Sequence, residues 1–468
     1  FVYHGLFNIP RILITDPRLI QEVLVSGAYN YTKAPRTRRV LGRILGGIGR
    51  DLIHLIIAYT RHLGRPIIQG DVHKYQRKML NPAFSLRYIR DMVPTFFEPV
   101  LALRDLWKTE MIGEDSLEVD VLDGMSRATL DIIGLAVTGE RGLNVRVSFL
   151  KIQTCPLYVS SRLRLRFPSR ERRPRETLRA EQSLLGHLQP SSTPYEHTDD
   201  VDPSTVQPAD GVKLANETGT DNLSKNLIKE ARERKKEGND GKDLLSSLVN
   251  EKNEETGEVM SDDDLKAQIM TFLAAGHETT SVSTTWCLYL LAQRPDIQAA
   301  LRAEIAPLFS NLDRAALPTY DAINSLDLLN RVVKETLRLI PPVPLTTRVN
   351  LQDVVLGGYH IPKNTITFIA PAVTQRDERL WGADALEFNP DRWLEEPAKS
   401  ISPYAYMPFL AGARQCIGNK FALMEMKVLV ATMVTAFAFK EKEGWKVTKK
   451  QSITWRPHPG MRLVLERP

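Results

Sequence analysis

A single cysteine in an unusual loop constrains this chain more than any other feature. Residues 409–418 read FLAGARQCIG and lie directly before an apolar run, Phe421–Phe439, that predicts a buried helix. The two glycines of the loop permit close approaches that other side chains would block. Arg414 and the positive end of the following helix are both expected to lower the pKa of the Cys416 thiol. The pattern therefore predicts a cysteine held as a thiolate anion.

The alternative interpretation treats Cys416 as a small core hydrophobe, the usual role of an isolated cysteine. The glycines and the arginine around it favour the thiolate instead. Cys155 and Cys287 lack such neighbours and keep the core interpretation. Cysteines without paired spacing predict neither a disulfide framework nor a zinc site. A thiolate ligand must stay reduced, which fits a protein that faces the cytosol.

Composition is that of a globular protein with a substantial core, because 43% of the 468 residues are hydrophobic. The net charge of +6 could favour acidic partners or anionic membrane surfaces. The sequence lacks the interleaved basic and aromatic pattern that would predict nucleic-acid binding. No apolar run approaches the roughly 18 residues that span a bilayer, and the start at Phe1 does not resemble a signal peptide.

Helical periodicity dominates, so the expected fold class is mainly α with a small β subdomain. Strands are expected near both ends and around residues 345–370, where Val354–Leu356 and Tyr359–Ile361 flank two glycines as a hairpin. Asp16-Pro17 is expected to open a helix after the strand Arg11–Thr15. The other expected helices are Val72–Leu80, Leu117–Thr138, Leu223–Lys235, Asp262–Gln293, Ile297–Phe309, Asn330–Leu339 and Phe421–Phe439.

Three segments lack the pattern of packed elements. Residues 51–69 interrupt a glycine-rich turn and are interpreted as an insertion. Residues 141–188 are rich in arginine, and residues 190–222 are rich in Pro, Ser, Thr and Asp, which is typical of a disordered loop. The chain is expected to form one domain over residues 1–468, with an atypical and partly disordered region at 141–222.

A Glu-x-x-Arg motif precedes the cysteine loop. Glu335 and Arg338 are three residues apart and share one face of the predicted helix. Arg392 follows in Phe388-Asn-Pro-Asp-Arg-Trp393. Alone, such a pair is usually a surface ion pair worth less than about 1 kcal/mol.

A second motif, Ala275-Gly-His-Glu-Thr279, lies midway along a predicted apolar helix. A zinc-protease motif is excluded, because Ser281 stands where His-Glu-x-x-His requires histidine. Glycine, an acid and hydroxyl groups are locally unfavourable inside a hydrophobic helix. The alternative interpretation is a tolerated helix distortion with satisfied hydroxyl groups.

All three motifs, in this order and spacing, resemble those of the cytochrome P-450 family. The resemblance covers residues 1–47, 70–139 and 242–468, is greatest to eukaryotic, particularly fungal, membrane-associated members, and implies the cytochrome P-450 fold. At 51–69 and 141–222 the chain either diverges or includes segments that splicing normally removes. The cysteine loop matches the family's Phe-x-x-Gly-x-Arg-x-Cys-x-Gly pattern at Phe409, Gly412, Arg414, Cys416 and Gly418.

The resemblance implies a haem b cofactor, with Thr279 hydrogen-bonding dioxygen and its delivering water and Glu278 assisting proton supply. Glu335, Arg338 and Arg392 are implied to form a buried structural triad. The implied haem-binding residues are Cys416 as the axial iron ligand, Phe409, Arg414 and Gly418 in its loop, Ala275 and Gly276 above the iron, and Arg348, Arg77 and His73 as further partners of the propionates.

The implied activity is a haem-thiolate monooxygenase that inserts one atom of dioxygen into a lipophilic substrate, in a cavity that Pro341–Thr347 would border. NADPH would supply electrons through a separate reductase, because the chain has no Gly-x-Gly-x-x-Gly nucleotide motif. The resemblance also implies the cytosolic face of the endoplasmic reticulum membrane, with attachment through a segment that this chain does not contain. Two alternatives stay open: a haem-thiolate isomerase or peroxygenase that needs no reductase, and an inactive haem-binding protein.

Overall fold

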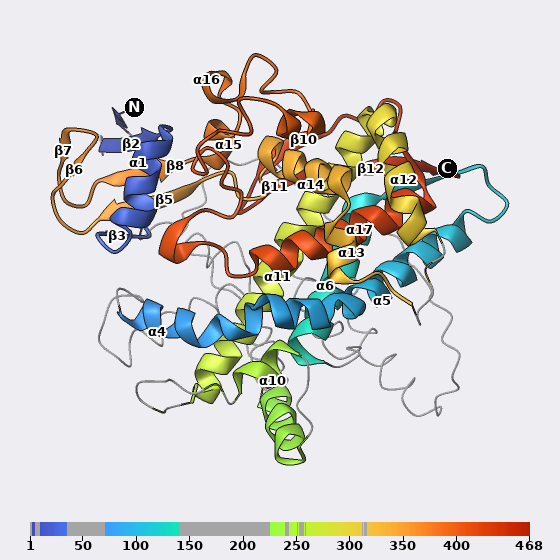
Figure 1. Cartoon of the computed structure of the whole chain (residues 1–468), viewed down its shortest axis with the longest axis horizontal. Coiled ribbons are helices and arrows are strands. Elements are labelled where there is room, and N and C mark those ends of the chain that lie inside the picture. Colours follow the sequence, from blue (N-terminus) through green and yellow to red (C-terminus); the bar gives the residue numbers. More distant parts are fainter. Residues whose placement is uncertain are drawn as a thin grey trace, which may run out of the picture.

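The structure is a computed structural model of the chain, and helices make up most of it (Figure 1). It describes residues 2–4, 10–34, 71–139, 225–238, 243–249, 259–310 and 316–468, together with residues 251, 257 and 312. Cys155, the expected insertion at 51–69 and the atypical region at 141–222 lie outside these residues. The prediction of a mainly α fold with a small β part is confirmed.

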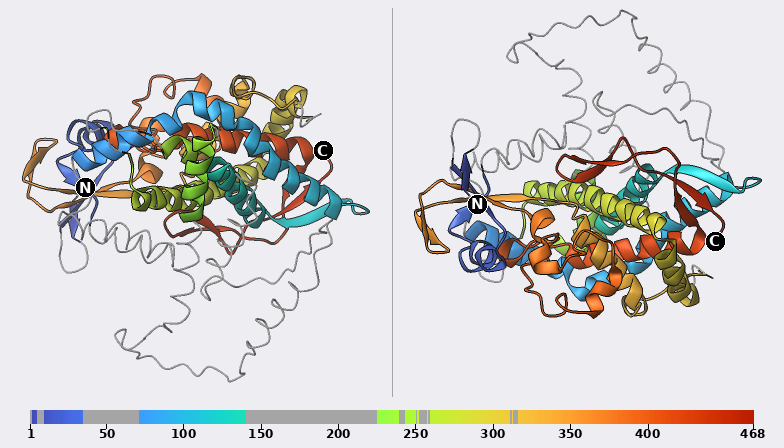
Figure 2. Two further views of the ribbon diagram at one scale, coloured as in Figure 1. Left: turned by 90° about the horizontal axis from the view of Figure 1, so that it is seen from below. Right: turned by 90° about the horizontal axis from the view of Figure 1, so that it is seen from above.

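The longest helix, α11 (Asp262–Gln293), runs through the middle of the molecule in all three views (Figures 1 and 2). The Ser261 side chain accepts a hydrogen bond from the Asp264 N–H, and three aspartates in the first turn stabilise the positive helix end. Its apolar side chains join the main core, to which α5 (Leu86–Glu110), α6 (Val121–Thr138), α12 (Pro295–Phe309), α14 (Asp327–Leu339) and α17 (Asn419–Ala436) also contribute.

The remaining helical elements are short. Residues 225–236 are also helical. The others are α1 (Pro17–Gln21), α4 (Asp71–Leu80), α10 (Leu244–Leu248), α13 (Tyr320–Asn324), α15 (Pro371–Thr374), α16 (Glu378–Trp381), the π-helical turn η2 (Glu22–Ser26), and the 3₁₀ turns η3 (Pro82–Phe84), η4 (Pro390–Leu394) and η5 (Gly412–Arg414).

A five-stranded sheet lies at the end of the molecule that holds the N-terminus (Figure 1). Its order is β1-β2-β8-β5-β3, and β2 pairs with β8 in parallel while the other pairs are antiparallel. The strands are β1 (Val2–His4), β2 (Pro10–Ile14), β3 (Tyr31–Thr32), β5 (Thr346–Asn350) and β8 (Ile366–Ile369).

Three smaller antiparallel sheets complete the β structure of the described residues. The expected hairpin at 354–361 is confirmed as β6 (Val354–Leu356) and β7 (Tyr359–Ile361). A second hairpin joins β10 (Thr448–Gln451) to β11 (Trp455–His458). The third sheet has the order β4-β12-β9, formed by β4 (Ser116–Asp120), β12 (Arg462–Glu466) and β9 (Ala438–Glu441).

Three sequence predictions differ from the structure. The helix predicted over Phe421–Phe439 ends at Ala436, and Ala438–Glu441 form the strand β9. The helix α5 was not predicted, because Pro94 and Pro99 interrupt its pattern, yet it runs unbroken for 25 residues. The helix predicted from Leu117 begins only at Val121, since the residues before it pair as β4 with β12. The side chain of Asp120 caps α6 by accepting from the Leu122 and Asp123 N–H groups.

Candidate functional site

The cysteine loop is closed by its own backbone. The Cys416 N–H donates to Phe409 O at 3.0 Å, and the Gln415 N–H donates to Gly412 O at 3.0 Å. Gly412 has a φ of +71°, and a Cβ there would lie 2.1 Å from Leu24 O of η2. Glycine is therefore required for the loop to pack on η2.

Gly418 differs, because its φ is −85° and a Cβ there would lie in ordinary contact, 3.8 Å from Phe84 Cε1. The surrounding protein gives no steric reason for glycine at this position.

The Cys416 side chain is exposed, yet protein closely surrounds it. Burial raises the pKa of its thiol, and a hydrogen bond from the Gly418 backbone and the charge of Arg77 oppose this rise. The predicted lowering of this pKa by Arg414 is therefore wrong for the chain alone. Binding of a metal ion deprotonates such a thiol.

One face of α11 is accessible in the middle of the core. Ala275 is exposed and Thr279, one helical turn later, is partly exposed, whereas residues 280–288 are buried. The Thr279 hydroxyl donates to Ala275 O at 2.7 Å, so its oxygen can still accept a hydrogen bond. The hydroxyl of Ser283 bonds back to the carbonyl of Thr279 in the same way, and α11 stays continuous.

Gly276 serves helix packing. A Cβ at this position would lie 2.9 Å from both Cγ1 and Cδ1 of Ile133 in α6. The missing side chain thus lets α6 and α11 approach closely. The room that the sequence predicted above an iron atom is not provided by this glycine.

Glu278 is held by the β10–β11 hairpin, an arrangement that the sequence did not predict. The Thr454 hydroxyl donates to Glu278 Oε1 at 2.8 Å. Nη1 of Arg456 lies 3.5 Å from the same oxygen. The acid is therefore oriented by residues far along the chain.

The four predicted propionate partners come together beside the cysteine loop. They are His73 and Arg77 of α4, Arg348 of β5, and Arg414 of η5. Nη1 of Arg77 donates to Gln415 O at 2.6 Å, which joins α4 to the loop. After burial, the charge of Arg414 is the next cause that lowers the pKa of His73 and of Arg348, so these side chains lie near one another.

Within the described residues, no carboxylate pairs with any member of this cationic cluster. Burial is the largest cause that lowers the pKa of His73 to about 4 and the pKa of Arg348 to about 10. Nδ1 of His73 and Nε of Arg414 are buried and have no hydrogen-bond partner in the part of the chain that the structure describes. Such groups are costly unless an anion satisfies them.

The donor set fits haem. Two propionates would neutralise the cationic cluster, and the accessible Cys416 thiol would supply one protein ligand to the iron. Among the described residues, no group of three or more His, Cys, Asp and Glu side chains could hold a metal ion.

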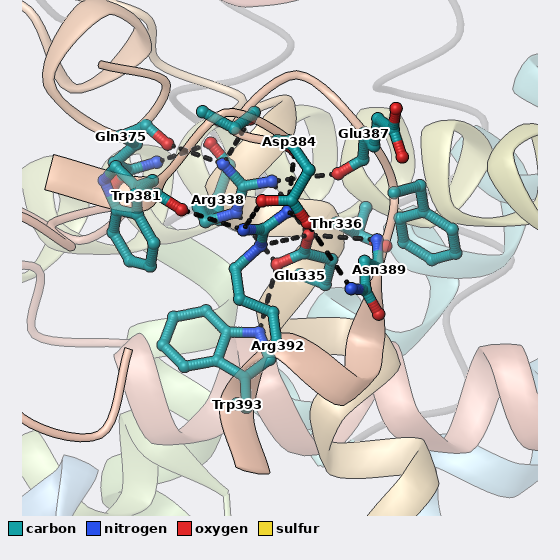
Figure 3. A network of polar contacts seen from close by, with 12 residues as sticks. Glu335, Thr336, Arg338, Gln375, Trp381, Asp384, Glu387, Asn389, Arg392 and Trp393 are labelled. Atoms are coloured by element: carbon teal, nitrogen blue, oxygen red, sulfur yellow. Dashed lines mark hydrogen bonds and ion pairs between the residues drawn. The ribbon is translucent and has the colours of Figure 1, made fainter. Parts of the chain in front are cut away.

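The predicted triad is a buried network around Glu335 (Figure 3). Arg338 donates to both carboxylate oxygens of Glu335, from Nε and Nη2, at 2.8 Å each. Arg392 Nε donates to Glu335 Oε1 at 3.3 Å, and Trp393 Nε1 donates to Glu335 Oε2 at 3.1 Å. The interpretation of this motif as an exposed ion pair is excluded, because Glu335 and Arg338 are fully buried.

Asp384 is a second acid of this network that the sequence analysis missed. Its Oδ1 and Oδ2 accept from Arg392 Nη1 and Nη2 at 2.6 and 2.7 Å, and these bonds hold the pKa of Asp384 below its usual value.

Gln375 connects the network to the segment that directly precedes the cysteine loop. Its backbone carbonyl accepts from Arg338 Nη1 at 2.9 Å, and its Oε1 accepts from the Met407 N–H at 2.7 Å.

Fold and site together are those of a haem-thiolate oxidoreductase. The family model for cytochrome P-450 matches residues 10–464. Cytochrome P-450 monooxygenase 205 of Postia placenta is 33% identical over 97% of this chain and 82% of its own length. Cytochrome P-450 monooxygenase sphH of Aspergillus fumigatus is 32% identical over 94% of this chain and 76% of its own length. Cytochrome P-450 3A12 of Canis lupus familiaris is 30% identical over 98% of this chain and 82% of its own length.

This chain belongs to the cytochrome P-450 family and is a cytochrome P-450 monooxygenase. Family membership implies a haem cofactor, dioxygen and an electron-transfer partner.

Proposed function

We propose that the chain holds haem b between the Cys416 loop and the accessible face of α11, and oxidises a lipophilic organic molecule. The observation that carries this proposal is a cationic cluster with which no carboxylate among the described residues pairs, beside an accessible cysteine thiol. When bound, haem would supply an iron for dioxygen activation, and ligation by the Cys416 thiolate would favour O–O cleavage. Arg348, Arg414, Arg77 and His73 position the group through its propionates.

Residues of α11 are proposed to bind water and to supply protons at the site. Thr279 keeps its hydroxyl oxygen available as an acceptor, because its proton is engaged by Ala275 O. It can therefore orient a water molecule or the dioxygen within the site. Glu278 supplies protons to that water from its position beside Thr279. Ala275, with its small side chain, leaves space on the same face.

One oxygen atom enters the substrate and the other leaves as water, with two electrons from NADPH delivered by a separate reductase. The segment Pro341–Thr347, which leads into β5, is proposed to border the substrate. Among the described residues, no helix has the length and hydropathy to cross a bilayer. The similarity to eukaryotic relatives supports our proposal that the protein acts at the cytosolic face of the endoplasmic reticulum membrane.

The test is the carbon monoxide difference spectrum of the reduced purified protein. We predict a haem-thiolate spectrum for the wild type and its loss in Cys416→Ser. The matched control is Cys287→Ala, since Cys287 is a buried cysteine of α11 and its loss should leave the spectrum unchanged. A Cys416→Ser spectrum equal to that of the wild type would refute the assignment. Absence of any haem spectrum in the wild type would favour an inactive protein.

NADPH consumption with and without a purified reductase then separates the reaction types. A monooxygenase consumes NADPH only when the reductase is present. Product formation that needs no reductase would favour the isomerase or peroxygenase.

A further inference from the structure

The hairpin β10–β11 brings two side chains to Glu278. Thr454 directly precedes β11, and Arg456 is its second residue. Alternate residues of an extended strand lie on one side, so Thr454 and Arg456 share a side while Trp455 faces away from them. The cationic groups of Arg376 and Lys449 lie over the ring of Trp455. The strand therefore presents a hydroxyl and a guanidinium together to the acid.

The position of this strand is set by its backbone. Nε1 of Trp286 in α11 donates to Trp455 O at 2.7 Å. The Trp455 N–H donates to Pro342 O at 2.9 Å. The backbone C=O and N–H of Trp455 are thus both hydrogen-bonded. The C=O accepts from α11, and the N–H donates to the segment proposed to border the substrate. The hairpin cannot move along α11 without breaking these bonds.

Both contacts engage one oxygen of the carboxylate. Thr454 Oγ1 and Arg456 Nη1 meet Glu278 Oε1, and within the described residues Oε2 receives no hydrogen bond. Thr454 is 1% exposed, whereas the Glu278 side chain is 22% exposed. A carboxylate anchored by one oxygen keeps its orientation while the other oxygen can exchange a proton with water.

We infer that Thr454 and Arg456 are positioning residues for Glu278, and that the C-terminal hairpin thereby controls how this acid supplies protons. The role of the acid rests on the proposed function, whereas the contact between hairpin and acid does not. Without the Thr454 hydroxyl, Oε1 loses its buried donor and the carboxylate loses its fixed orientation.

The first measurement is hydrogen exchange of backbone amides in the holoprotein. We expect Thr454→Val, which keeps the side-chain shape but removes the donor, to speed exchange in residues 452–458. Thr454→Ser should restore slow exchange, because serine retains the hydroxyl. Glu278→Leu, which removes both acceptor oxygens, should speed exchange in the same residues. Thr448→Val is the matched control, since that hydroxyl donates to His458 O at 3.3 Å and does not contact the acid.

The second measurement is the rate of NADPH oxidation with a purified reductase. Thr454→Val should slow it by about 2- to 10-fold, the effect of losing one hydrogen bond. Glu278→Gln removes the acid itself and should slow the rate at least as much. The double variant should be no slower than Glu278→Gln alone, because Thr454 then has no acid to position. Arg456→Lys should retain more of the rate than Arg456→Gln, and Lys450→Gln on the neighbouring strand should leave it unchanged.

Multiplicative slowing in the double variant would overturn the inference, as would wild-type exchange and rate in Thr454→Val. A Glu278→Gln protein that oxidises NADPH at the wild-type rate would instead refute the proposed role of the acid. The exchange data on residues 452–458 would then still decide whether the hairpin and Glu278 are coupled.

Discussion

Burial determines how strongly each charged residue of the Glu335 network contributes. The side chains of Glu335 and Arg338 are fully buried, and the side chain of Arg392 is 5% exposed. Asp384, which pairs with the same Arg392, is 42% exposed. Removal of one partner from a buried pair leaves an uncompensated charge, whereas water screens an exposed pair.

We predict that Glu335→Gln lowers the free energy of unfolding by about 3–5 kcal/mol. Asp384→Asn should cost about 1 kcal/mol, because solvent screens this partner. The control is Asp321→Asn, whose pair with Arg90 is exposed on both sides, and it should change stability by less than about 0.5 kcal/mol. Urea denaturation of the three variants measures the loss in free energy of unfolding for each. Equal losses would contradict the predicted order.

Glu425 of α17 is a second informative residue, because it is a fully buried acid. Within the described residues, neither of its carboxyl oxygens has a partner with hydrogen-bond geometry, although Thr280 lies beside it. Burial raises the pKa of Glu425 well above its usual value, so the folded protein favours the protonated carboxyl. In the unfolded chain the same carboxyl ionises above about pH 4.3.

The folded state therefore loses stability from this residue as the pH rises above that value. We predict that Glu425→Gln, which mimics the protonated carboxyl, stabilises the protein more at pH 8 than at pH 5. Urea denaturation at both pH values measures the difference. An effect of equal size at both would show that the carboxyl does not stay protonated in the fold.

The sequence predicted the residues with a fixed spacing and missed those defined only by folding. Cys416, Glu335 and Arg338 belong to recognisable motifs. Asp384 and Thr454 do not, because nothing local distinguishes them from ordinary surface residues. The pKa of the thiol was predicted with the wrong sign, since the dominant cause is burial, which no local pattern reveals.

At the scale of elements, the contact of α6 with α11 depends on one missing side chain. Gly276 lies against Ile133, and a methyl group there would approach two of its carbon atoms to 2.9 Å. A second link joins the same helices nearby, where the Thr129 hydroxyl and Nδ1 of His277 lie 3.2 Å apart. Overpacking at this contact would separate the helices or force strained rotamers.

We predict that Gly276→Ala lowers the free energy of unfolding by about 1–3 kcal/mol. In an Ile133→Ala background the same substitution should cost less, because the carbon atoms that it meets are absent. Urea denaturation of the four proteins of this double-mutant cycle measures the coupling. Equal costs in both backgrounds would exclude the contact as the cause.

The prediction of elements succeeded where periodicity was uninterrupted. The bounds of α11 and of the hairpin β6–β7 were predicted correctly. The helix α5 was missed because its prolines mimic helix ends, although tertiary packing maintains the helix around them. The strand β4 was assigned to a helix because its partner, β12, lies near the other end of the chain.

For the molecule as a whole, the cationic cluster electrostatically destabilises the folded state of the haem-free chain. Arg77, Arg348 and Arg414 repel one another, and burial lowers the pKa of each. An anion bound among them should therefore stabilise the folded state by mass action.

We predict that phosphate raises the Tm of the haem-free protein more than chloride does at equal ionic strength. The holoprotein should show little difference, because the propionates already occupy the cluster. Arg348→Gln should reduce the phosphate effect on the haem-free protein. Differential scanning calorimetry checks all three cases, and equal phosphate effects with and without haem would contradict the assignment of the cluster.

The sheet β4-β12-β9 joins residues 462–466 to residues 116–120. During synthesis on a ribosome, β4 emerges long before its partner exists, and the cysteine loop also appears late. Until β12 is synthesised, the early part of the nascent chain therefore has an unpaired strand and exposed apolar surface. This state is prone to aggregation. Cellular chaperones would act on this chain mainly during that interval, and the prosthetic group could be loaded only after it.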